Sequence, residues 1–143
     1  MNAIENNPLI EISSDKTRLD IDFIHAFLTK AYWAKGRAKE EIKLTIEHSL
    51  CYGIYLDGQQ IGFTRVLTDY AVFAYLMDVF IDENHRGKAY SKQLLNTIFD
   101  DPTLANIQQW ALKTGDAHGL YEQFGFKLIK DPERWMVRKG FDR

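Results

Sequence analysis

The sequence predicts an α/β fold in which a mixed, mostly antiparallel central sheet carries helices on both faces. Three observations lead to this class. Hydrophobic residues recur at helical spacing in the first third of the chain, and two β-rich runs then meet at Asp57-Gly58. After these runs the sequence alternates between strand-like and helix-like segments, an order typical of α/β proteins.

The first third is expected to form a short strand near Leu9 to Ile12 and then two helices. Asp20 can cap the first helix, because its carboxylate can accept backbone N–H groups at a helix start. The apolar residues that follow have helical spacing: Ile21, Ile24, Leu28 and Ala31. Gly36 interrupts the pattern, and a second helix is expected to carry Ala38, Ile42, Ile46 and Leu50 on one side.

The middle of the chain is expected to be mainly β-structure. Asp57-Gly58 favours a two-residue hairpin turn, because such turns need positive φ. A further strand is predicted at about Val72 to Ile81. A helix with four inward-facing residues should follow: Leu94, Leu95, Ile98 and Phe99.

The last third is predicted to contain a strand from Ile107 to Lys113 and a short helix at about residues 117–124. Gly125 is well placed as a C-terminal glycine cap for that helix. The runs FKLIK (residues 126–130) and RWMVRK (residues 134–139) can supply one or two final strands.

The composition indicates one globular domain over residues 1–143, with 45% hydrophobic and 13% aromatic residues. A net charge of −2 without a basic face argues against nucleic-acid binding. The basic residues Lys35, Arg37 and Lys39 are followed by two glutamates, which predicts a solvated, charge-balanced helix start. No signal peptide is seen, and the longest apolar run is too short to span a bilayer. A cytoplasmic protein without a membrane partner is therefore expected.

Several kinds of chemistry lack their sequence patterns. No Gly-rich loop ends in Lys-Ser/Thr, which excludes phosphoryl transfer of that type. The four histidines are scattered without a His/Cys pair at ligand spacing, so no metal cofactor is expected. The single cysteine, Cys51, cannot form an internal disulfide and lies in an apolar run, which favours a buried position.

The stretch HRGKAYSKQLL, from His85 to Leu95, lies where a strand should end and a helix should begin. Unpaired backbone N–H groups and the helix dipole favour an anion at such a junction. Arg86 and Lys88 add positive charge, and the small residues between and after them would let a phosphate approach the backbone. An ordinary helix start has the same ingredients, so the local pattern leaves both alternatives open.

Two longer stretches, YLMDVFIDENHRGKAYSKQLL and GLYEQFGF, resemble the GNAT superfamily of N-acetyltransferases. The central motif of that family is Arg/Gln-x-x-Gly-x-Gly/Ala at the start of a helix. Arg86 matches its first position, whereas Ala89 and Ser91 stand where the family usually has glycine and glycine or alanine. The second signature is matched by Leu120, Tyr121, Glu122, Gly125 and Phe126. The predicted order of elements also agrees, from about Asp20 onward.

The resemblance implies an enzyme that transfers an acetyl group from acetyl-CoA to a primary amine by direct attack. The preceding strand would offer backbone groups to the pantetheine at Val79, Phe80 and Ile81. Backbone N–H groups of the helix-start loop would hold the pyrophosphate of coenzyme A, at Arg86, Gly87, Lys88, Ala89, Tyr90 and Ser91. Thr114 stands where many relatives carry an asparagine that bonds the cofactor. The methyl group of Ala89 could crowd a phosphate oxygen.

The resemblance also implies catalytic roles for Tyr121 and Asp78. The family places the tyrosine beside the sulfur, where a phenol can protonate the departing thiolate; packing on a short helix is the alternative role. Relatives often have a carboxylate at the position of Met77, and Asp78 is the nearest remaining one. Asp78 could take a proton through water, orient the substrate amine, or only satisfy buried backbone donors. Asp116 could contact substrate or cap the tyrosine helix.

Substrate selection in this fold usually depends on the first two helices and their loop, which here contain Tyr32 and Trp33. This pair could form a wall of the acceptor pocket or cover the core. The acceptor, a small-molecule or peptide amine, is not identified by the sequence, and a homodimer is left open. The rival function is a catalytically weak acyl-CoA-binding module, which Met77, Ala89 and Ser91 would suit; retention of Tyr121 favours the enzyme.

Overall fold

The computed structural model describes residues 9–141, which fall into two compact parts with the boundary between Lys113 and Thr114. The sheet and the three longer helices lie in the first part, and one short helix lies in the second. The expectation of a single domain over residues 1–143 stays a prediction.

The first part is built on one five-stranded sheet with the strand order β1-β2-β3-β4-β5. Its strands are β1 (Ile10–Ser13), β2 (Leu50–Leu56), β3 (Gln59–Thr68), β4 (Phe73–Ile81) and β5 (Gln109–Ala111). Neighbouring strands are antiparallel from β1 to β4, and β5 is parallel to β4. The predicted mixed, mostly antiparallel sheet is therefore confirmed.

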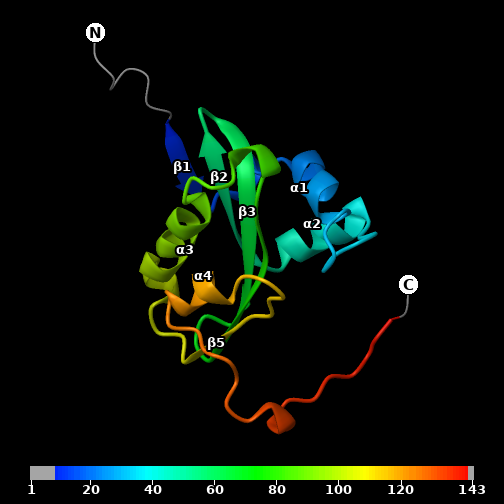
Figure 1. Ribbon diagram of the computed structural model, residues 1–143. Helices are drawn as coiled ribbons and strands as arrows, with labels where there is room; N and C mark the ends of the chain where they lie inside the picture. Colours follow the sequence, from blue (N-terminus) through cyan, green and yellow to red (C-terminus); the bar gives the residue numbers. More distant parts are fainter. Residues whose placement is uncertain (1–8, 142–143) are drawn as a thin grey trace. The chain divides into compact units, whose positions relative to one another are not determined.

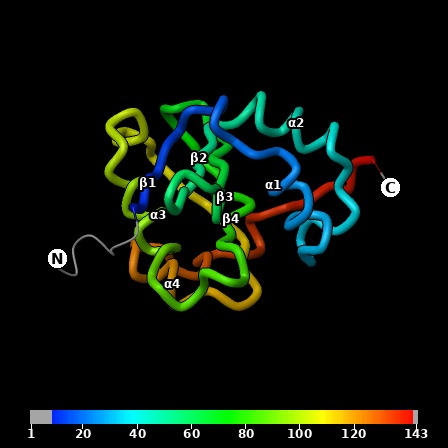
Figure 2. The backbone as a smooth tube through the Cα atoms, turned by 90° about the horizontal axis from the view of Figure 1, so that it is seen from above, coloured from blue at the N-terminus to red at the C-terminus, as the bar shows by residue number. Residues whose placement is uncertain are grey.

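Helices cover both faces of this sheet (Figures 1 and 2). On one face lie α1 (Ile21–Leu28) and α2 (Lys39–Glu47), and on the other lies α3 (Tyr90–Asp100). Three 3₁₀ turns lie between strands and helices of this part: η2 (Lys16–Arg18) between β1 and α1, η3 (Glu83–His85) between β4 and α3, and η4 (Pro102–Leu104) between α3 and β5. The predicted α/β layering is thus present within the first part.

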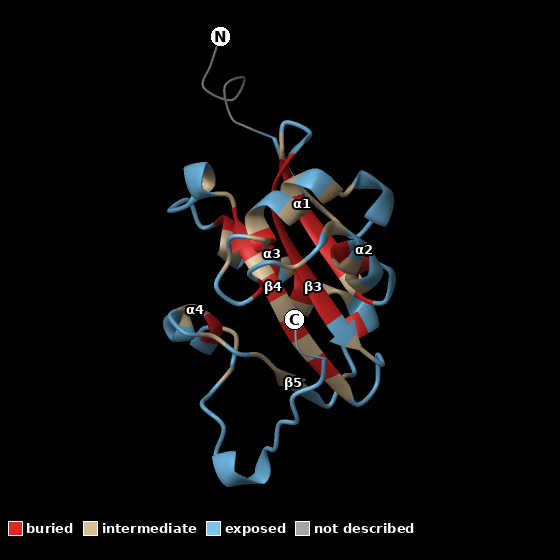
Figure 3. Ribbon diagram, turned by 90° about the vertical axis from the view of Figure 1, so that its right-hand side faces the viewer, coloured by how far each residue is buried: buried red, intermediate tan, exposed pale blue. Residues whose placement is uncertain are grey.

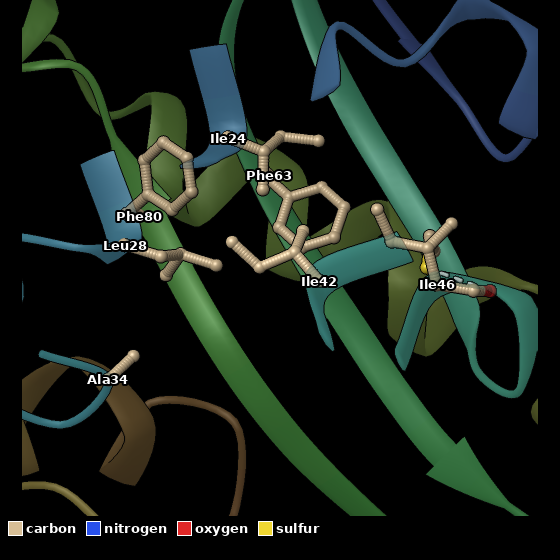
Figure 4. Packing of buried hydrophobic residues seen from close by; sticks show 8 residues of the cluster. Ile24, Leu28, Ala34, Ile42, Ile46, Phe63 and Phe80 are labelled. Carbon is tan, nitrogen blue, oxygen red and sulfur yellow. Dashed lines mark hydrogen bonds between the residues drawn. The ribbon is translucent and has the colours of Figure 1, made fainter. Parts of the chain in front are cut away.

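The core between the sheet and α1 and α2 follows from the helical spacing of apolar residues. Ile24 and Leu28 of α1 and Ile42 of α2 are at most 1% exposed and lie against Phe63 of β3 (Figure 4). The buried positions continue along β3 and β4 (Figure 3). Each such side chain contributes about 1.5–3 kcal/mol to folding. Truncating Leu28 to alanine would leave a cavity and cost about 2–5 kcal/mol.

Local signals in the first half of the chain are confirmed at two places. Asp20 caps α1, since its Oδ1 accepts the N–H of Phe23 at 3.1 Å. The hairpin between β2 and β3 turns at Asp57 and Gly58, whose φ values are 49° and 85°. Both residues therefore adopt the left-handed conformation that a type I′ turn requires.

Other element boundaries differ from the prediction. The second helix does not include Ala38 or Leu50, because Ala38 is its N-cap and Leu50 pairs with Val66 in the sheet. The strand expected from Ile107 to Lys113 is only Gln109–Ala111. These three residues pair with Phe73–Tyr75 of β4, and the ladder ends there.

The second part contains the short helix α4 (His118–Glu122), which is shorter than expected. Its predicted glycine cap is confirmed: Gly125 has φ 88°, and the N–H of Phe126 donates to the carbonyl of Tyr121 at 3.3 Å. The left-handed residue lets the chain turn back over the last carbonyls of the helix.

The final strands expected at residues 126–130 and 134–139 are wrong, because neither described segment is a strand. A 3₁₀ turn, η5 (Pro132–Arg134), is the regular structure nearby. Apolar side chains favour a strand only when a neighbouring strand completes its hydrogen bonds. Here Leu128, Met136 and Val137 are 82%, 92% and 81% exposed.

Candidate functional site

The edge of β4 that faces β5 is the first feature of the site. The two strands pair only from Phe73 to Tyr75, opposite Gln109–Ala111. The opposite edge of β4 continues to pair with β3 as far as Ile81. Within the described residues, β4 therefore runs on from Leu76 to Ile81 without a ladder to β5, and backbone groups on this edge have no β5 partner. Backbone groups along such an edge can form hydrogen bonds with an extended ligand.

A β-bulge interrupts β4 at Asp78. Phe63 pairs with Phe80 and Arg65 with Met77, so two residues of β4, Asp78 and Val79, lie opposite the single Thr64 of β3. Asp78 has φ 55°, a left-handed conformation that is uncommon for residues with a side chain. Bulges bend the strand and redirect side chains, and they are frequent near active sites.

The side chain of Asp78 is buried and holds three other side chains. Its Oδ2 accepts from Nε of Arg65 at 2.6 Å and from Nη1 of Arg37 at 2.9 Å. Its Oδ1 accepts from the indole Nε1 of Trp33 at 3.0 Å. Arg65 also donates from Nη1 to Oγ of Ser49 at 3.1 Å. The candidate catalytic carboxylate and the candidate acceptor-binding residue Trp33 are therefore in direct contact.

The solvated helix start expected around Lys35, Arg37 and Lys39 is wrong for Arg37. Its side chain is only 15% exposed and forms an ion pair with Asp78, 41 residues further along the chain. The surface ion pair of the neighbouring Lys39 is with Asp22 of α1, at 2.5 Å. The expectation failed because the partner of Arg37 is distant in sequence.

Arg65, Ser49 and Arg37 are the site residues that sequence reasoning missed. Arg65 did carry a signal, because it interrupts the apolar strand run IGFTRVL much as Asp78 interrupts the next one. Opposite charges inside two adjacent buried strands rarely occur unless they are paired. Ser49 and Arg37 had no comparable local signal.

A series of aromatic rings connects β4 to the loop between α1 and α2. Phe80 stacks on Phe27, with ring centroids 3.9 Å apart and planes at 5°. Trp33 lies 6.3 Å from Phe27, and Tyr32 meets Trp33 edge-on at 5.1 Å. The side chain of Phe80 thus packs in the core, so only the backbone groups of this residue could contact a cofactor. Trp33 and Tyr32 are 41% and 69% exposed, so they present an aromatic surface beside Asp78.

The loop from Arg86 to Ala89 joins η3 to α3 and is positively charged and exposed, whereas Tyr90 and Ser91 already belong to α3. The N-terminus of α3 has no side-chain cap and no acidic residue in its first turn. The first backbone N–H groups of the helix are therefore available to an anion, and the helix dipole favours one there. Gly87 has φ 79° with open space around it, so this glycine is needed for its conformation.

Two further features of this loop were not predicted. Ala89 has φ 63° and ψ 20°, so the position where the family usually has glycine is in the left-handed conformation. A residue with a side chain adopts it at a cost of about 1–2 kcal/mol. Arg86 donates from Nε to the carbonyl of Ile81 at 3.2 Å, and its guanidinium carbon lies 5.8 Å from the ring centroid of Phe27. This arginine is therefore oriented across the end of β4.

In the second part, Tyr121 lies on α4, and its ring meets that of Phe126 edge-on at 6.1 Å. The hydroxyl of Thr114 accepts the N–H of Ala117 at 3.0 Å, just before α4 begins. The side-chain oxygen that accepts a backbone N–H group just before this helix therefore belongs to Thr114 rather than to Asp116. The Thr114 hydroxyl keeps its own proton as a donor for another group.

Cys51 is 1% exposed, as expected for a buried residue. Burial raises the pKa of its thiol to about 11. Because the thiolate is the nucleophilic form, this environment makes Cys51 unreactive. Among residues 9–141, no helix is long and apolar enough to cross a membrane, and no group of three or more His, Cys, Asp or Glu side chains could hold a metal ion.

Comparison with known proteins places these features in a family context. A family model described as an acetyltransferase (GNAT) domain matches residues 47–128, more than half of the chain. A crystal structure of a GNAT-family protein from Xanthomonas campestris pv. campestris is 42% identical, with a TM-score of 0.89 over 93% of this chain and 94% of that one. A Gibberella zeae protein named "Putative acetyltransferase FG08082" is 26% identical over 84% of this chain and 80% of its own length.

A predicted acetyltransferase from Clostridium acetobutylicum, whose structure was determined with acetyl-CoA, shares the fold. Its TM-score is 0.65 over 93% of this chain and 96% of that one, at 13% identity.

Proposed function

The chain belongs to the GNAT family of acetyltransferases, and on that premise we propose that it transfers the acetyl group of acetyl-CoA to a primary amine by direct attack. The proposal rests on one observation: two features follow each other along the chain within the first part of the molecule. Within the described residues, the edge of β4 beyond Tyr75 has no ladder to β5, and β4 leads through a cationic loop into the uncapped N-terminus of α3. An extended strand edge and an anion site in succession suit a long thioester that ends in a pyrophosphate.

In this proposal the cofactor is held mainly by backbone groups. Val79, Phe80 and Ile81 would bond the pantetheine, and the N–H groups of the loop at residues 86–91 would bond the pyrophosphate. Arg86 and Lys88 would add charge, although backbone groups need no particular side chain. Backbone binding would explain how Ala89 can stand in place of the glycine, and Ser91 in place of the glycine or alanine, that are usual in the family. The Thr114 hydroxyl is proposed as a further donor to the cofactor.

The chemical step needs one proton acceptor and one proton donor. The amine nitrogen attacks the thioester carbonyl carbon, the C–N bond forms, and the C–S bond breaks. The ammonium loses a proton, and the departing thiolate takes one. We assign the donor role to the phenol of Tyr121. General acid catalysis by a positioned side chain typically raises the reaction rate by about 10²–10⁴-fold.

Asp78 is better suited to positioning than to proton transfer. Both of its oxygens already accept N–H groups, from Arg65, Arg37 and Trp33. Protonation would place a neutral acid between two guanidinium groups and forfeit both ion pairs. We therefore propose that Asp78 fixes Trp33 and Arg37 on the acceptor side, and that water or another group accepts the proton.

The test is release of free thiol from acetyl-CoA across a panel of small amines and peptides, together with a thermal shift by coenzyme A. A ligand that binds only the native state raises its melting temperature. Ala89→Glu should abolish this shift because it places a negative charge where the pyrophosphate would lie; Glu122→Gln on α4 would be a charge-change control outside the loop. Thiol release with any amine supports the enzyme. A thermal shift without thiol release would instead support the acyl-CoA-binding module.

The proposal also includes a cytoplasmic location and a homodimer. For the dimer, the support is the second part of the chain, where large apolar side chains between residues 128 and 141 are exposed. A second copy of the chain could cover them. Light scattering after gel filtration would measure the mass, and Met136→Glu with Val137→Lys should convert a dimer to a monomer. A monomeric parent protein would refute this assignment.

A further inference from the structure

The cluster around Asp78 contains an unbalanced positive charge. Two guanidinium groups, those of Arg37 and Arg65, share a single carboxylate, so its formal charge is +1. Among the described residues, Asp78 is the only carboxylate within 4.0 Å of either guanidinium. The side chains of Asp78, Arg65 and Arg37 are 1%, 8% and 15% exposed. Charges withdrawn from water are costly unless they are paired, so this site favours an additional anion.

Arg37 is the member of the cluster that can reach such an anion. A guanidinium has five N–H donors in a planar fork. Arg65 donates from Nε to Asp78 and from Nη1 to Ser49, and it is nearly buried. Arg37 is more exposed and, among the contacts of the described residues, uses only its Nη1 in a side-chain hydrogen bond, to Asp78. The rest of its fork is available to a carboxylate, which guanidinium groups bind in a bidentate manner.

The neighbourhood of Arg37 is ordered and faces an aromatic surface. The loop is held by its own backbone, through the N–H of Gly36 to the carbonyl of Thr29 at 3.2 Å and the N–H of Arg37 to that of Ala34 at 3.0 Å. The same carboxylate that holds Arg37 also holds Trp33, whose ring is 41% exposed. A cation and an aromatic ring are thus kept in a fixed relation at the surface.

This cluster also adjoins the strand edge assigned to the cofactor. Asp78 directly precedes Val79, the first residue of that edge, and these two residues form the bulge opposite Thr64 of β3. An acceptor bound at Arg37 would therefore be linked through Asp78 to the part of β4 that is proposed to bind the pantetheine. The arrangement suits an acceptor whose amine reaches the thioester while its negative group stays on the guanidinium.

We propose that Arg37 binds a carboxylate of the acceptor, and that the preferred acceptors are amines that also carry a carboxylate, as amino acids do. This inference rests on the proposed acetyl transfer. Asp78 acts here as a positioning residue, because it orients the guanidinium and the indole. A charge-assisted, bidentate contact of this kind should be worth about 10- to 100-fold in kcat/KM.

The experiment compares amino acids with their carboxamides as acceptors in the thiol-release assay, for the parent protein and for Arg37→Gln. Because the two acceptors differ in amine basicity, the quantity of interest is the change in the acid-to-amide ratio of kcat/KM between the two proteins. We expect this ratio to fall about 10- to 100-fold in Arg37→Gln, mainly through KM for the acid. Lys35→Gln removes a positive charge two positions away and should leave the ratio unchanged.

Outcomes for this inference and for acetyl transfer remain distinguishable. Turnover with an unchanged ratio in Arg37→Gln would overturn the carboxylate contact and leave the acetyltransferase intact. If no acceptor is turned over, calorimetric titration of the coenzyme A complex with the same acids and amides measures binding directly. Tighter binding of the acids, lost in Arg37→Gln, supports the contact without catalysis. Equal binding of acids and amides, or none of either, overturns it.

Discussion

The indole N–H of Trp33 donates a hydrogen bond to Oδ1 of Asp78 at 3.0 Å, across 45 positions of the sequence. This contact joins the loop between α1 and α2 to the bulge in β4. It brings a candidate acceptor-binding residue and a candidate catalytic residue into one cluster, so that a change in one should be felt by the other.

Asp78→Asn should destabilise the protein and lower turnover without shifting its pH profile. The amide removes the negative charge and turns an NH₂ group toward donors, which leaves two largely buried guanidinium groups without an anion. Breaking a buried pair in this way costs roughly 3–5 kcal/mol. Chemical denaturation and the pH dependence of kcat would measure the two effects. Asp22→Asn, which loses only a surface pair with Lys39, should hardly change the free energy of unfolding. Unchanged stability with activity regained at high pH would instead identify Asp78 as the base.

Ala89→Gly should stabilise the protein, whereas glycine in a helix interior is destabilising. Ala89 has φ 63°, a conformation that is strained for alanine but not for glycine. Relief of this strain should outweigh the added flexibility of glycine and increase the free energy of unfolding by up to about 1 kcal/mol. Ala26→Gly is the matched control inside α1, where glycine should cost about 1 kcal/mol. Thermal unfolding would compare the two variants. Equal losses in both would mean that Ala89 carries no strain.

Tyr121→Phe should lower kcat by about 100-fold or more, because the thiolate would leave without a general acid. The ring and its edge-on packing against Phe126 are retained, so coenzyme A affinity should hardly change. Steady-state kinetics and a thermal shift with coenzyme A would separate these quantities. Full kcat in the variant would limit Tyr121 to a packing role.

The thiol of Cys51 should be silent in the thiol-release assay. Burial raises its pKa to about 11, above the ordinary value, so at pH 8 the folded protein has almost no thiolate. The unfolded chain ionises near pH 8.5, so the stability gained by burying the neutral thiol is complete below that pH and declines as the pH rises toward 11. Labelling with a disulfide reagent at pH 8 should modify the thiol only after denaturation. Rapid labelling of the native protein would show that Cys51 is accessible.

The sequence by itself determined the features whose causes are local. Asp20 caps α1, Asp57-Gly58 turns the hairpin, and Gly125 ends α4, because each depends on the conformation or hydrogen bonds of residues a few positions away. The apolar periodicity of the helices likewise predicted that Ile24, Leu28, Ile42 and Ile46 enter the core, although Ala38, expected beside them, is exposed. Two motifs at the right separation then indicated the family, and with it the loop from Arg86 to Ser91.

Only the tertiary structure decided what depends on partners distant in the chain. The charges at Arg37 and Arg65 could not be assigned to Asp78 from spacing, because 41 and 13 residues separate them from it and a bulge sets its direction. The β-like runs after residue 125 failed as strands for the same reason: a strand exists only where another strand completes its ladder. The left-handed conformation of Ala89 was equally hidden, since alanine gives no local signal for it and the surrounding chain imposes it.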